Sequence, residues 1–519
     1  MNAAPQAGVG GGRPRFALPE DAEPGRAVVV GSGPNGLTAG ALLARAGWDV
    51  EVHERHTAPG GACASCPLLG EGTVVDLGAA GHPFGIASPA FQELALTSHG
   101  LRWVHPEVVM AHPLPGSAPG LLHRDLERTA DGLGVDAGRW RRLHAPFVEG
   151  SARLVDNVLG PLVRPWPHPL TMARFGLRAP WPASAIADGL FRTEQARALF
   201  VGSAAHAVMA PSRPLTGAFG TLFGALGMSS GWPVAEGGSQ AIVDALVQVL
   251  RAHGGRLHLG SPVEDLGTFA DADAVLLDLT PTQVARLHGT GLSERSLSRM
   301  RRWRHGPAAS KVDFLLDGPI PWSDAGVAQA GTVHLGGTAA DLRRAESEAA
   351  AGRMPEEPFV MLCQQQAADP SRATGPAAGR HVVWSYAHVP HGHPGDVTDA
   401  VIARIERFAP GFRDRVVRIE TTPPAALEAW NPNLVGGDIA GGAMDGLQLL
   451  ARPRASAAPH RLRSAVPRSR GRRHGDGSGP GLYLASSATP PGAGVHGMAG
   501  AWAARTLLAD RTWGTGMRR

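Results

Sequence analysis

Cysteine and lysine are both scarce in this chain of 519 residues. Its three cysteines are too few to build a disulfide framework, which favours a reducing, cytoplasmic compartment. Lysine is nearly absent, so arginine carries the positive charge, and we interpret this as a coding bias. Eight arginines and one aspartate fall within residues 451–480, and without them the chain is slightly acidic. The high isoelectric point therefore gives little support to a nucleic-acid partner.

The sequence also lacks a clear targeting or membrane-spanning segment. Residues 1–25 are rich in Gly, Ala and Pro without an apolar centre, which predicts a disordered leader and not a signal peptide. The longest uncharged run, residues 214–235, carries several Gly and Pro, so a buried helix and turn is favoured over a membrane span. A chain of this length is too long for one core, so at least two domains are expected.

The most informative stretch runs from Ala27 to Gly61. Residues 27–30 predict a buried strand, residues 37–46 a helix, and residues 49–53 a second strand. A G-x-G-x-x-G turn lies between the first strand and the helix, and an acidic residue ends the second strand about 20 residues later. This βαβ unit predicts a dinucleotide site formed by Gly31, Ser32, Gly33, Pro34, Asn35, Gly36 and Glu54.

Each residue type in this unit has a physical purpose. Gly31 permits a sharp turn, Gly33 lets the backbone approach a pyrophosphate, and Gly36 lets the helix pack close to the strand. The helix N-terminus offers free N–H groups to the phosphates, and the acidic residue can bind ribose hydroxyls. A second glycine pair follows the acidic residue, as is typical of FAD proteins, in the run that contains Arg55, Gly60, Gly61 and Ala62.

Together with two later segments, this stretch resembles the FAD-dependent phytoene desaturase and amine oxidase superfamily. Residues 232–264 contain a Gly237-Gly238 turn before a helix, and then Val263 at the position where this family contacts adenine through backbone groups. Residues 481–505 predict a strand, a glycine-rich turn and a helix, where the family surrounds the flavin. The resemblance implies FAD as the cofactor, with further contacts from Gly492, Gly494, Val495 and Met498.

The resemblance also implies an α/β fold. A discontinuous Rossmann-type FAD-binding domain is interleaved with an α+β substrate domain that contains an antiparallel sheet. We expect residues 26–105, 235–300 and 480–519 in the FAD domain, and residues 106–234 and 301–450 in the substrate domain. Residues 451–479 are Arg-rich without periodicity, so we expect a flexible insertion there; a locally shifted reading frame or a patch for anionic membranes are the alternatives.

Two residues are candidate catalytic groups. Lys311 precedes an alternating strand, and amine-oxidase-like members of the family hold a lysine near flavin N5 at a similar place. A cation there stabilises the electron-rich reduced flavin. The alternative is a strand-edge lysine that reaches solvent. His496 lies at the start of the last predicted helix, and is either a flavin or substrate contact or simply packs at the helix start.

Other side chains with reactive groups are weaker candidates. Cys63 and Cys66 form a C-x-x-C pair after the second glycine turn, which is compatible with a redox dithiol. The chain has no second G-x-G-x-x-G for NAD, and its C-terminal segment resembles desaturases, so this hypothesis is disfavoured. The histidines show no metal-ligand spacing, and no metal site is predicted.

The resemblance implies a two-electron oxidation in which hydride goes to the flavin and a neighbouring proton is lost. The leading interpretation is desaturation of a hydrophobic, carotenoid-like or other isoprenoid substrate, with oxygen or a quinone as the electron acceptor. The alternatives are amine oxidation, redox-neutral polyene isomerisation, and FAD bound only for structure. Residues 161–181 are broken by several Pro and contain Trp166, Met172, Phe175 and Trp181, which suits an apolar tunnel, a peripheral membrane contact or ordinary packing.

Overall fold

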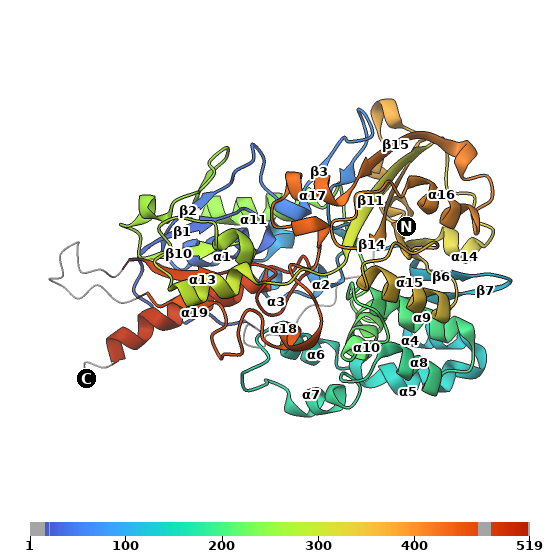
Figure 1. Cartoon of the computed structure of the whole chain (residues 1–519), viewed down its shortest axis with the longest axis horizontal. Coiled ribbons are helices and arrows are strands. Elements are labelled where there is room, and N and C mark those ends of the chain that lie inside the picture. Colours follow the sequence, from blue (N-terminus) through green and yellow to red (C-terminus); the bar gives the residue numbers. More distant parts are fainter. Residues whose placement is uncertain (1–15, 20, 466–478, 517–519) are drawn as a thin grey trace.

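The structure is a computed structural model that describes residues 16–19, 21–465 and 479–516. Two sheets at opposite ends of the molecule organise it (Figure 1). The first sheet has six strands in the order β16-β17-β10-β1-β2-β9. Five of them run parallel, and β16 is antiparallel at the edge. The bounds are β1 Arg26–Val30, β2 Asp49–His53, β9 Arg256–His258, β10 Ala274–Leu277, β16 Arg461–Arg463 and β17 Gly481–Leu484.

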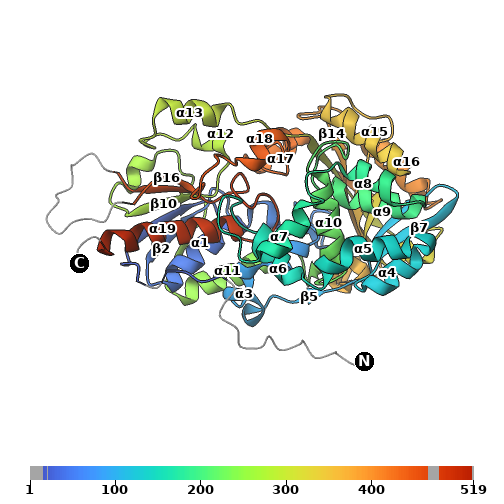
Figure 2. The ribbon, with the colours of Figure 1, turned by 90° about the horizontal axis from the view of Figure 1, so that it is seen from below.

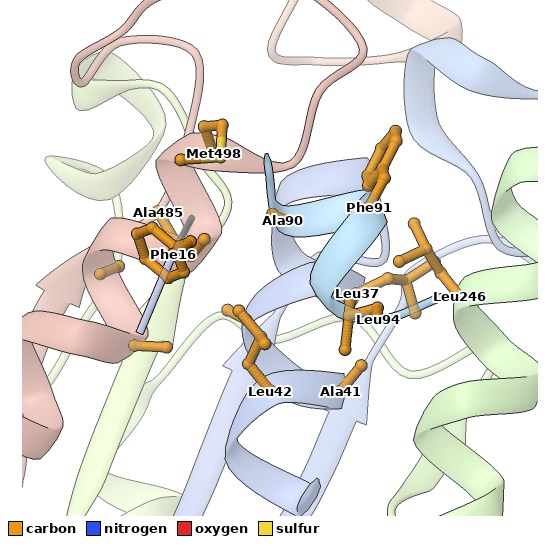
Figure 3. Packing of buried hydrophobic residues seen from close by; sticks show 14 of the residues in the cluster. Phe16, Leu37, Ala41, Leu42, Ala90, Phe91, Leu94, Leu246, Ala485 and Met498 are labelled. Atoms are coloured by element: carbon orange, nitrogen blue, oxygen red, sulfur yellow. The ribbon is translucent and has the colours of Figure 1, made fainter. Parts of the chain in front are cut away.

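Helices α1 (Pro34–Arg45), α11 (Gln240–Ala252) and α19 (Met498–Gly516) pack together beside this sheet. Figure 3 shows Leu37, Ala41 and Leu42 of α1 packed among side chains from neighbouring segments. A Cβ atom at Gly500 would lie 1.8 Å from the carbonyl oxygen of Asn35, so only glycine lets α19 approach α1 this closely. The C-terminal helix therefore completes the dinucleotide domain.

The position of Phe16 contradicts the prediction that residues 1–25 form a disordered leader. Its side chain is buried, and its ring meets Trp502 of α19 edge-to-face at 5.3 Å. Leu18 and Ala22 also pack against the same core. The leader is therefore not disordered over the described residues 16–19 and 21–25, and residues 1–15 and 20 lie outside the description.

The second sheet has seven strands in the order β15-β11-β14-β13-β12-β6-β7. All neighbours are antiparallel except β12 and β6, which run parallel. β11 is buried along its whole length, and β14 is buried beyond its first residue. The bounds are β6 Val108–Leu114, β7 Ser117–Leu122, β11 Ala308–Leu316, β12 Ala330–Leu335, β13 Val360–Cys363, β14 His381–Val389 and β15 Val416–Thr422.

A layer of helices lies below this sheet in Figure 1 and faces the viewer in Figure 2. Its members are α4 Leu126–Gly132, α5 Ala137–Val148, α6 Ser151–Val158, α7 Pro169–Gly176, α8 Ala183–Leu190, α9 Glu194–Ala205 and α10 Thr216–Gly227. The buried α10 lies in the long uncharged run. Across the described ranges, no helix has the length and apolarity to cross a membrane. The expected fold class, a Rossmann-type domain with a separate sheet domain, is confirmed.

Shorter elements connect the two parts. Two small ribbons pair β3 Ser65–Cys66 with β4 Val75–Asp76, and β5 Trp103–Val104 with β8 Val234–Ala235. The other helices named in the figures or below are α2 Pro83–Ala87, α3 Pro89–Glu93, α12 Pro281–Val284, α13 Glu294–Arg301, α14 Ala325–Ala328, α15 Ala339–Ala350, α16 Thr398–Glu406, α17 Pro424–Trp430 and α18 Gly446–Leu450.

The Arg-rich segment is not a flexible insertion in its described part, residues 451–465. Arg452 is buried and donates to the carbonyl oxygens of Ala440, Gly441 and Ser487 at 3.0–3.2 Å. Arg461 forms an ion pair with Asp510 of α19. These arginines serve internal packing, so the expectation of a solvated loop is wrong here; residues 466–478 lie outside the description.

Candidate active site

A cavity of about 880 Å³ lies between the two sheets. The dinucleotide turn forms one end, and strands β11, β13 and β14 contribute to the other. The cavity is therefore built by segments far apart in the chain. Of the predicted site residues, those that line it are Gly31, Ser32, Gly33, Pro34, Asn35, Glu54, Arg55, Gly61, Ala62, Val263, Lys311, Gly494 and Val495.

The turn after β1 has no room for side chains. A Cβ at Gly36 would lie 2.1 Å from the carbonyl oxygen of Gly31, and Gly31 itself has φ near +99°. Gly33 is the N-cap of α1, and no side chain caps the helix. The first helical turn therefore offers backbone N–H groups to an anion in the cavity. Gly36 does not line the cavity itself; it holds the helix against the strand.

Glu54 lies buried at the end of β2. One of its carboxylate oxygens accepts hydrogen bonds from the Ser32 N–H at 3.0 Å and the Ser32 hydroxyl at 2.7 Å. The other accepts from the His56 N–H at 2.9 Å. Glu54 thus fixes the glycine turn and presents a carboxylate to the cavity, which suits a ribose hydroxyl pair.

The second glycine pair touches the first turn. Gly60 and Gly61 have φ of +136° and +51°, which favours glycine at both positions. A Cβ at Gly61 would lie 3.3 Å from the Cα of Gly33, so the two loops meet where a pyrophosphate would bind. Gly60 does not line the cavity, but it shapes this approach.

Asp278 is a site residue that the sequence analysis missed. It follows β10, lines the cavity, and accepts a hydrogen bond from the Gly36 N–H at 3.0 Å. Burial raises its pKa to about 7, and Glu54 nearby adds to this, although the Gly36 bond opposes it. A polar residue at the carboxyl end of a parallel strand is the signal that could have found it.

The loop from Trp430 to Asn433 is another missed part of the site. Asn433 accepts a hydrogen bond from the Thr280 N–H at 2.8 Å and donates to the carbonyl oxygen of Asp278 at 3.3 Å. The Trp430 carbonyl oxygen lies 2.7 Å from Nε2 of His56. The loop therefore joins the second domain to the mouth of the dinucleotide turn.

His496 does not line the cavity. It is buried at the start of α19, and its Nδ1 accepts a hydrogen bond from the Met498 N–H at 3.0 Å. Burial lowers its pKa to about 4, so it is neutral. Gly492 and Met498 also lie outside the cavity wall, whereas Gly494 and Val495 line it. The geometry therefore favours helix-start packing for His496 over the expected cofactor contact.

Lys311 is the single lysine of the sequence and lines the cavity on β11. It is buried, so it is not the solvent-exposed edge lysine of the alternative interpretation. Its ammonium is ion-paired with Asp313 and lies 5.6 Å from the ring centre of Trp384. Burial raises the pKa of Asp313 to about 6, although Lys311 opposes this. The pair places a cation and its counter-ion beside the cavity.

Aromatic and apolar side chains make most of the wall around Lys311. Trp384 and Tyr386 of β14 meet edge-to-face at 5.2 Å. Phe223 of α10 packs against Trp232 at 5.3 Å and against Phe84 at 5.2 Å. The remaining wall residues on this side include Ala207, Val208, His206, Phe219, Ala309, Thr332, Met361, Cys363, Leu427, Leu434, Ile439 and Met444.

The cysteine pair has no sign of thiolate chemistry. Burial raises the pKa of Cys63 well above its usual value, and it also raises the pKa of Cys66. The Cys63 thiol donates to the carbonyl oxygen of Ser239. A reactive dithiol needs lowered pKa values, so the geometry disfavours that hypothesis.

One group in the described part of the chain has metal-ligand proximity, formed by Glu51, His53 and His258. The Glu51 carboxylate is already paired with Arg26 and Arg256. Two guanidinium groups on the carboxylate oppose a cation there, so this group gives no support to a metal site.

The comparisons with known proteins agree with this geometry. Residues 29–95 match the family described as an NAD(P)-binding Rossmann-like domain. Hydroxyneurosporene desaturase of Cereibacter sphaeroides is 28% identical over 93% of this chain and 98% of its own length. Pyridine nucleotide-disulfide oxidoreductase domain-containing protein 2 of Rattus norvegicus is 26% identical over 93% of each chain.

The fold has close counterparts among solved structures. Putrescine oxidase bound to putrescine superposes with a TM-score of 0.58 and 16% identity, over 94% of this chain and 99% of its own. Cyclohexylamine oxidase from Brevibacterium oxydans has a TM-score of 0.54 and 14% identity, over 96% of this chain and all of its own. This chain is thus similar in sequence to a protein named as a desaturase, and it shares its fold with the two amine oxidases. It is an oxidoreductase, and the fold and the relatives point to a flavin cofactor.

Proposed function

We propose that the chain is an FAD-dependent oxidoreductase that desaturates a carotenoid-like or other isoprenoid compound by a two-electron oxidation. The observation that carries this proposal is the continuity of one cavity, from the glycine turn at Gly33 to the aromatic wall around Lys311. Such a cavity would hold a dinucleotide at the glycine-turn end and offers an apolar compartment for a substrate at the other. Relatives named as desaturases support the substrate class.

The residues of the dinucleotide end fit FAD. The glycine turn admits a pyrophosphate, the α1 N-terminus supplies N–H groups, and Glu54 supplies a ribose acceptor. Val263 also lines the cavity, and its backbone groups suit the adenine. When bound, the flavin supplies the hydride acceptor, and oxygen or a quinone then takes the electrons. The protein orients the substrate, excludes water and sets the local charge.

The charge distribution of the wall favours a neutral substrate. The carboxylates that line the cavity are Glu54, Glu264 and Asp278, all on the dinucleotide side. On the other side the charged lining residue is Lys311, whose partner Asp313 is not part of the lining. A protonated amine would meet an ammonium and no free carboxylate there, which costs Coulomb energy. A polyene carries no charge to oppose Lys311, and most of the wall that it meets is aromatic or apolar.

Amine oxidation is the second candidate function. The observation that favours it is the fold likeness to the two amine oxidases, together with Lys311 at the cavity wall. Both functions use the same residues and the same cofactor. They differ in the charge of the substrate, so a direct comparison of substrates separates them.

The test is anaerobic mixing of the purified flavoprotein with acyclic carotenes, and separately with a diamine and cyclohexylamine. We expect the flavin absorbance to bleach only with the carotenes, and the product to have lost two hydrogens. Bleaching only with the amines would support the second candidate. A rearranged product without bleaching would show isomerisation, and neither change with any compound would leave a binding role. Each of these last three results contradicts the proposed desaturation.

We also propose that residues 162–181 contact a membrane from which such a substrate is taken. Leu170, Leu177 and Trp181 are 78%, 72% and 60% exposed. Arg174 and Arg178 lie among them without an ion pair in the described chain, and residues 157–187 contain no acidic residue. Trp181 is next to α10, because its carbonyl oxygen accepts the Gly217 N–H at 2.9 Å, and α10 lines the cavity through Phe219.

Exposed Trp and Leu with unpaired arginines suit an anionic bilayer surface. Flotation with phosphatidylcholine vesicles that contain phosphatidylglycerol should carry the wild type. The variant Leu170→Ser/Leu177→Ser/Trp181→Ser should stay behind, and Val417→Ser on the exposed strand β15 should float like the wild type. Equal flotation of all three proteins would contradict the proposal.

A further inference from the structure

The half-buried His206 and the buried His334 and His112 form a file that starts at the cavity wall. His206 lines the cavity after α9 and packs against Trp232 with ring centres 4.6 Å apart. Its Nε2 lies 2.9 Å from Nε2 of His334 on β12. His112 on β6 follows, with ring centres 6.0 Å from His334. These contacts join helix α9 to two neighbouring strands of the second sheet.

Gly202 of α9 brings the second and third rings together. A Cβ there would lie 2.6 Å from Nδ1 of His334 and 2.7 Å from Nδ1 of His112. Both nitrogens therefore face the same point on the helix, and glycine is required for both rings to fit. Both nitrogens are also buried without a hydrogen-bond partner in the described chain. Leaving such groups unpaired is costly, and the bonded contact of His334 in this cluster is the one to His206.

The far end of the file leads toward solvent. Nε2 of His112 lies 2.8 Å from the carbonyl oxygen of Gly337, so it carries a proton and donates it. Gly337 precedes Thr338, the half-buried N-cap of α15. The file thus connects the cavity wall to the start of a surface helix.

We propose that the hydrogen-bonded pair of His206 and His334 takes up the proton that the substrate loses. This inference rests on the proposed oxidation. One C–H bond breaks and its electron pair leaves with the hydrogen as hydride, which reduces the flavin. The neighbouring C–H bond breaks, its electron pair forms the new double bond, and its proton goes to His206. Two electrons and one proton reach the flavin, and one proton enters the file.

The nitrogens of each ring allow this transfer. Nε2 of His206 faces His334, which leaves the Nδ1 edge for the cavity. A proton arriving at Nδ1 lets His206 pass its Nε2 proton to His334. The proton is then shared by the two rings across the 2.9 Å contact between their Nε2 atoms. Each ring accepts on one nitrogen and donates from the other.

Burial keeps the resting file neutral. Burial lowers the pKa of His206 to about 3 and of His112 to about 4, and it lowers the pKa of His334 well below its usual value. The groups that face the file are His388 of β14, paired with Glu346 of α15, and Arg404 of α16. Burial opposes a positive charge on these rings, so the proton transfer depends on the negative charge that the cavity gains when hydride leaves the substrate.

The first test is the rate of anaerobic flavin reduction by substrate. We expect His206→Ala to lose on the order of 100-fold and to be partly rescued by added imidazole, because a positioned base gives roughly this factor. His334→Gln should slow reduction and change its pH profile. His144→Gln is the matched control, because His144 is buried in the same domain but does not line the cavity. Wild-type rates in both His206→Ala and His334→Gln would overturn the proposal.

The second test needs no substrate. Nitrogen-15 spectra of the histidine-labelled holoprotein should show one strongly deshielded N–H shared by His206 and His334. It should vanish in His206→Phe and in His334→Phe, and persist in His144→Gln. Its absence in the wild type would overturn the file. If no substrate bleaches the flavin but this signal is present, the proposed function fails and the hydrogen-bonded file stands.

Discussion

The carboxylate of Asp278 accepts a hydrogen bond from the backbone N–H of Gly36 at 3.0 Å, in the first turn of α1. Burial raises the pKa of this carboxyl to about 7. A group with this pKa beside the pyrophosphate position makes cofactor binding depend on pH. The protonated form is neutral and tolerates phosphate oxygens, whereas the ionised form repels them.

Asp278→Asn should remove this dependence. In the wild type, we expect FAD affinity to fall as the pH rises through about 7, because Asp278 loses its proton there. The asparagine variant keeps an acceptor for Gly36 but has no charge, so its affinity should stay level and exceed the wild type at pH 8 by about tenfold, or 1.4 kcal/mol. Fluorescence titration with FAD from pH 5.5 to 8.5 measures this. Parallel curves for the two proteins would refute the role of Asp278.

Gly36→Ala should abolish cofactor binding, whereas the same change in a remote helix should not. The added methyl would lie 2.1 Å from the Gly31 carbonyl oxygen, and backbone cannot yield there cheaply. Flavin content per chain should drop below about one tenth, since even 1.4 kcal/mol costs tenfold in affinity. Gly138→Ala is the control, because nothing lies within 4 Å of its Cβ position in α5. It should retain flavin and gain up to about 1 kcal/mol of stability.

Arg372 should be a large contributor to stability. It pairs with Asp76 and Asp369 at 2.8 Å, and all three are buried. Arg372→Gln leaves two buried carboxylates without a cation, so urea unfolding should show a loss of about 3–5 kcal/mol. The exposed pair of Arg301 and Glu294 is the control, where Arg301→Gln should cost less than about 1 kcal/mol.

The stability contributed by the cluster of Arg372, Asp76 and Asp369 should fall at low pH. Burial raises the pKa of Asp76, but Arg372 and the bonds from Ser65 and Ser239 outweigh it, so the pKa is lowered from 3.8. The stability that Asp76 contributes is complete above its unfolded pKa and is lost as the pH falls through its folded pKa. Wild-type stability should therefore decline below about pH 4, and Arg372→Gln should flatten that decline. An unchanged acid slope in the variant would be evidence against the pairing.

Asp313→Asn should raise the midpoint potential of the bound flavin. The Asp313 carboxylate offsets the field of Lys311, and its removal exposes the reduced flavin to an uncompensated ammonium. We expect a rise of about 30 mV at pH 6, which corresponds to 1.4 kcal/mol for two electrons. Lys311→Met should shift the potential less, because Asp313 then takes up a proton. A lower potential in Asp313→Asn would contradict this assignment of Lys311.

The cysteines should be dispensable for the reaction. Burial raises the pKa of both Cys63 and Cys66, so neither is a ready thiolate. The double variant Cys63→Ser/Cys66→Ser should reduce and reoxidise its flavin within about twofold of the wild type. Loss of turnover with an intact flavin spectrum would restore the dithiol hypothesis.

The sequence predicted the dinucleotide end of the site because local geometry there demands particular residues. A Cβ at Gly36 collides with backbone five residues earlier, so the glycine spacing is visible in the chain itself. Glu54 likewise bonds Ser32 at the end of the adjacent parallel strand. Such constraints act between near neighbours, and they leave a readable pattern.

The features that the sequence did not predict depend on contacts between distant parts of the chain. The composition of its segment predicts that Arg452 is solvated, yet it is buried and donates to the carbonyl oxygens of residues 440, 441 and 487. The sequence places Phe16 in a predicted disordered leader, yet its ring packs on Trp502. His206 and His334 are 128 residues apart and meet only because α9 packs against the second sheet at β6 and β7. No periodicity or spacing in the sequence indicates these contacts.

The central claim is that one FAD occupies the cavity between Gly33 and Lys311, and the released cofactor tests it most directly. The purified protein should be yellow, and denaturation should release one FAD per chain, identified by mass. Gly36→Ala prepared in parallel should release almost none, while Gly138→Ala should release as much as the wild type. Release of NAD instead of a flavin, or of no nucleotide even after incubation with FAD, would contradict the account.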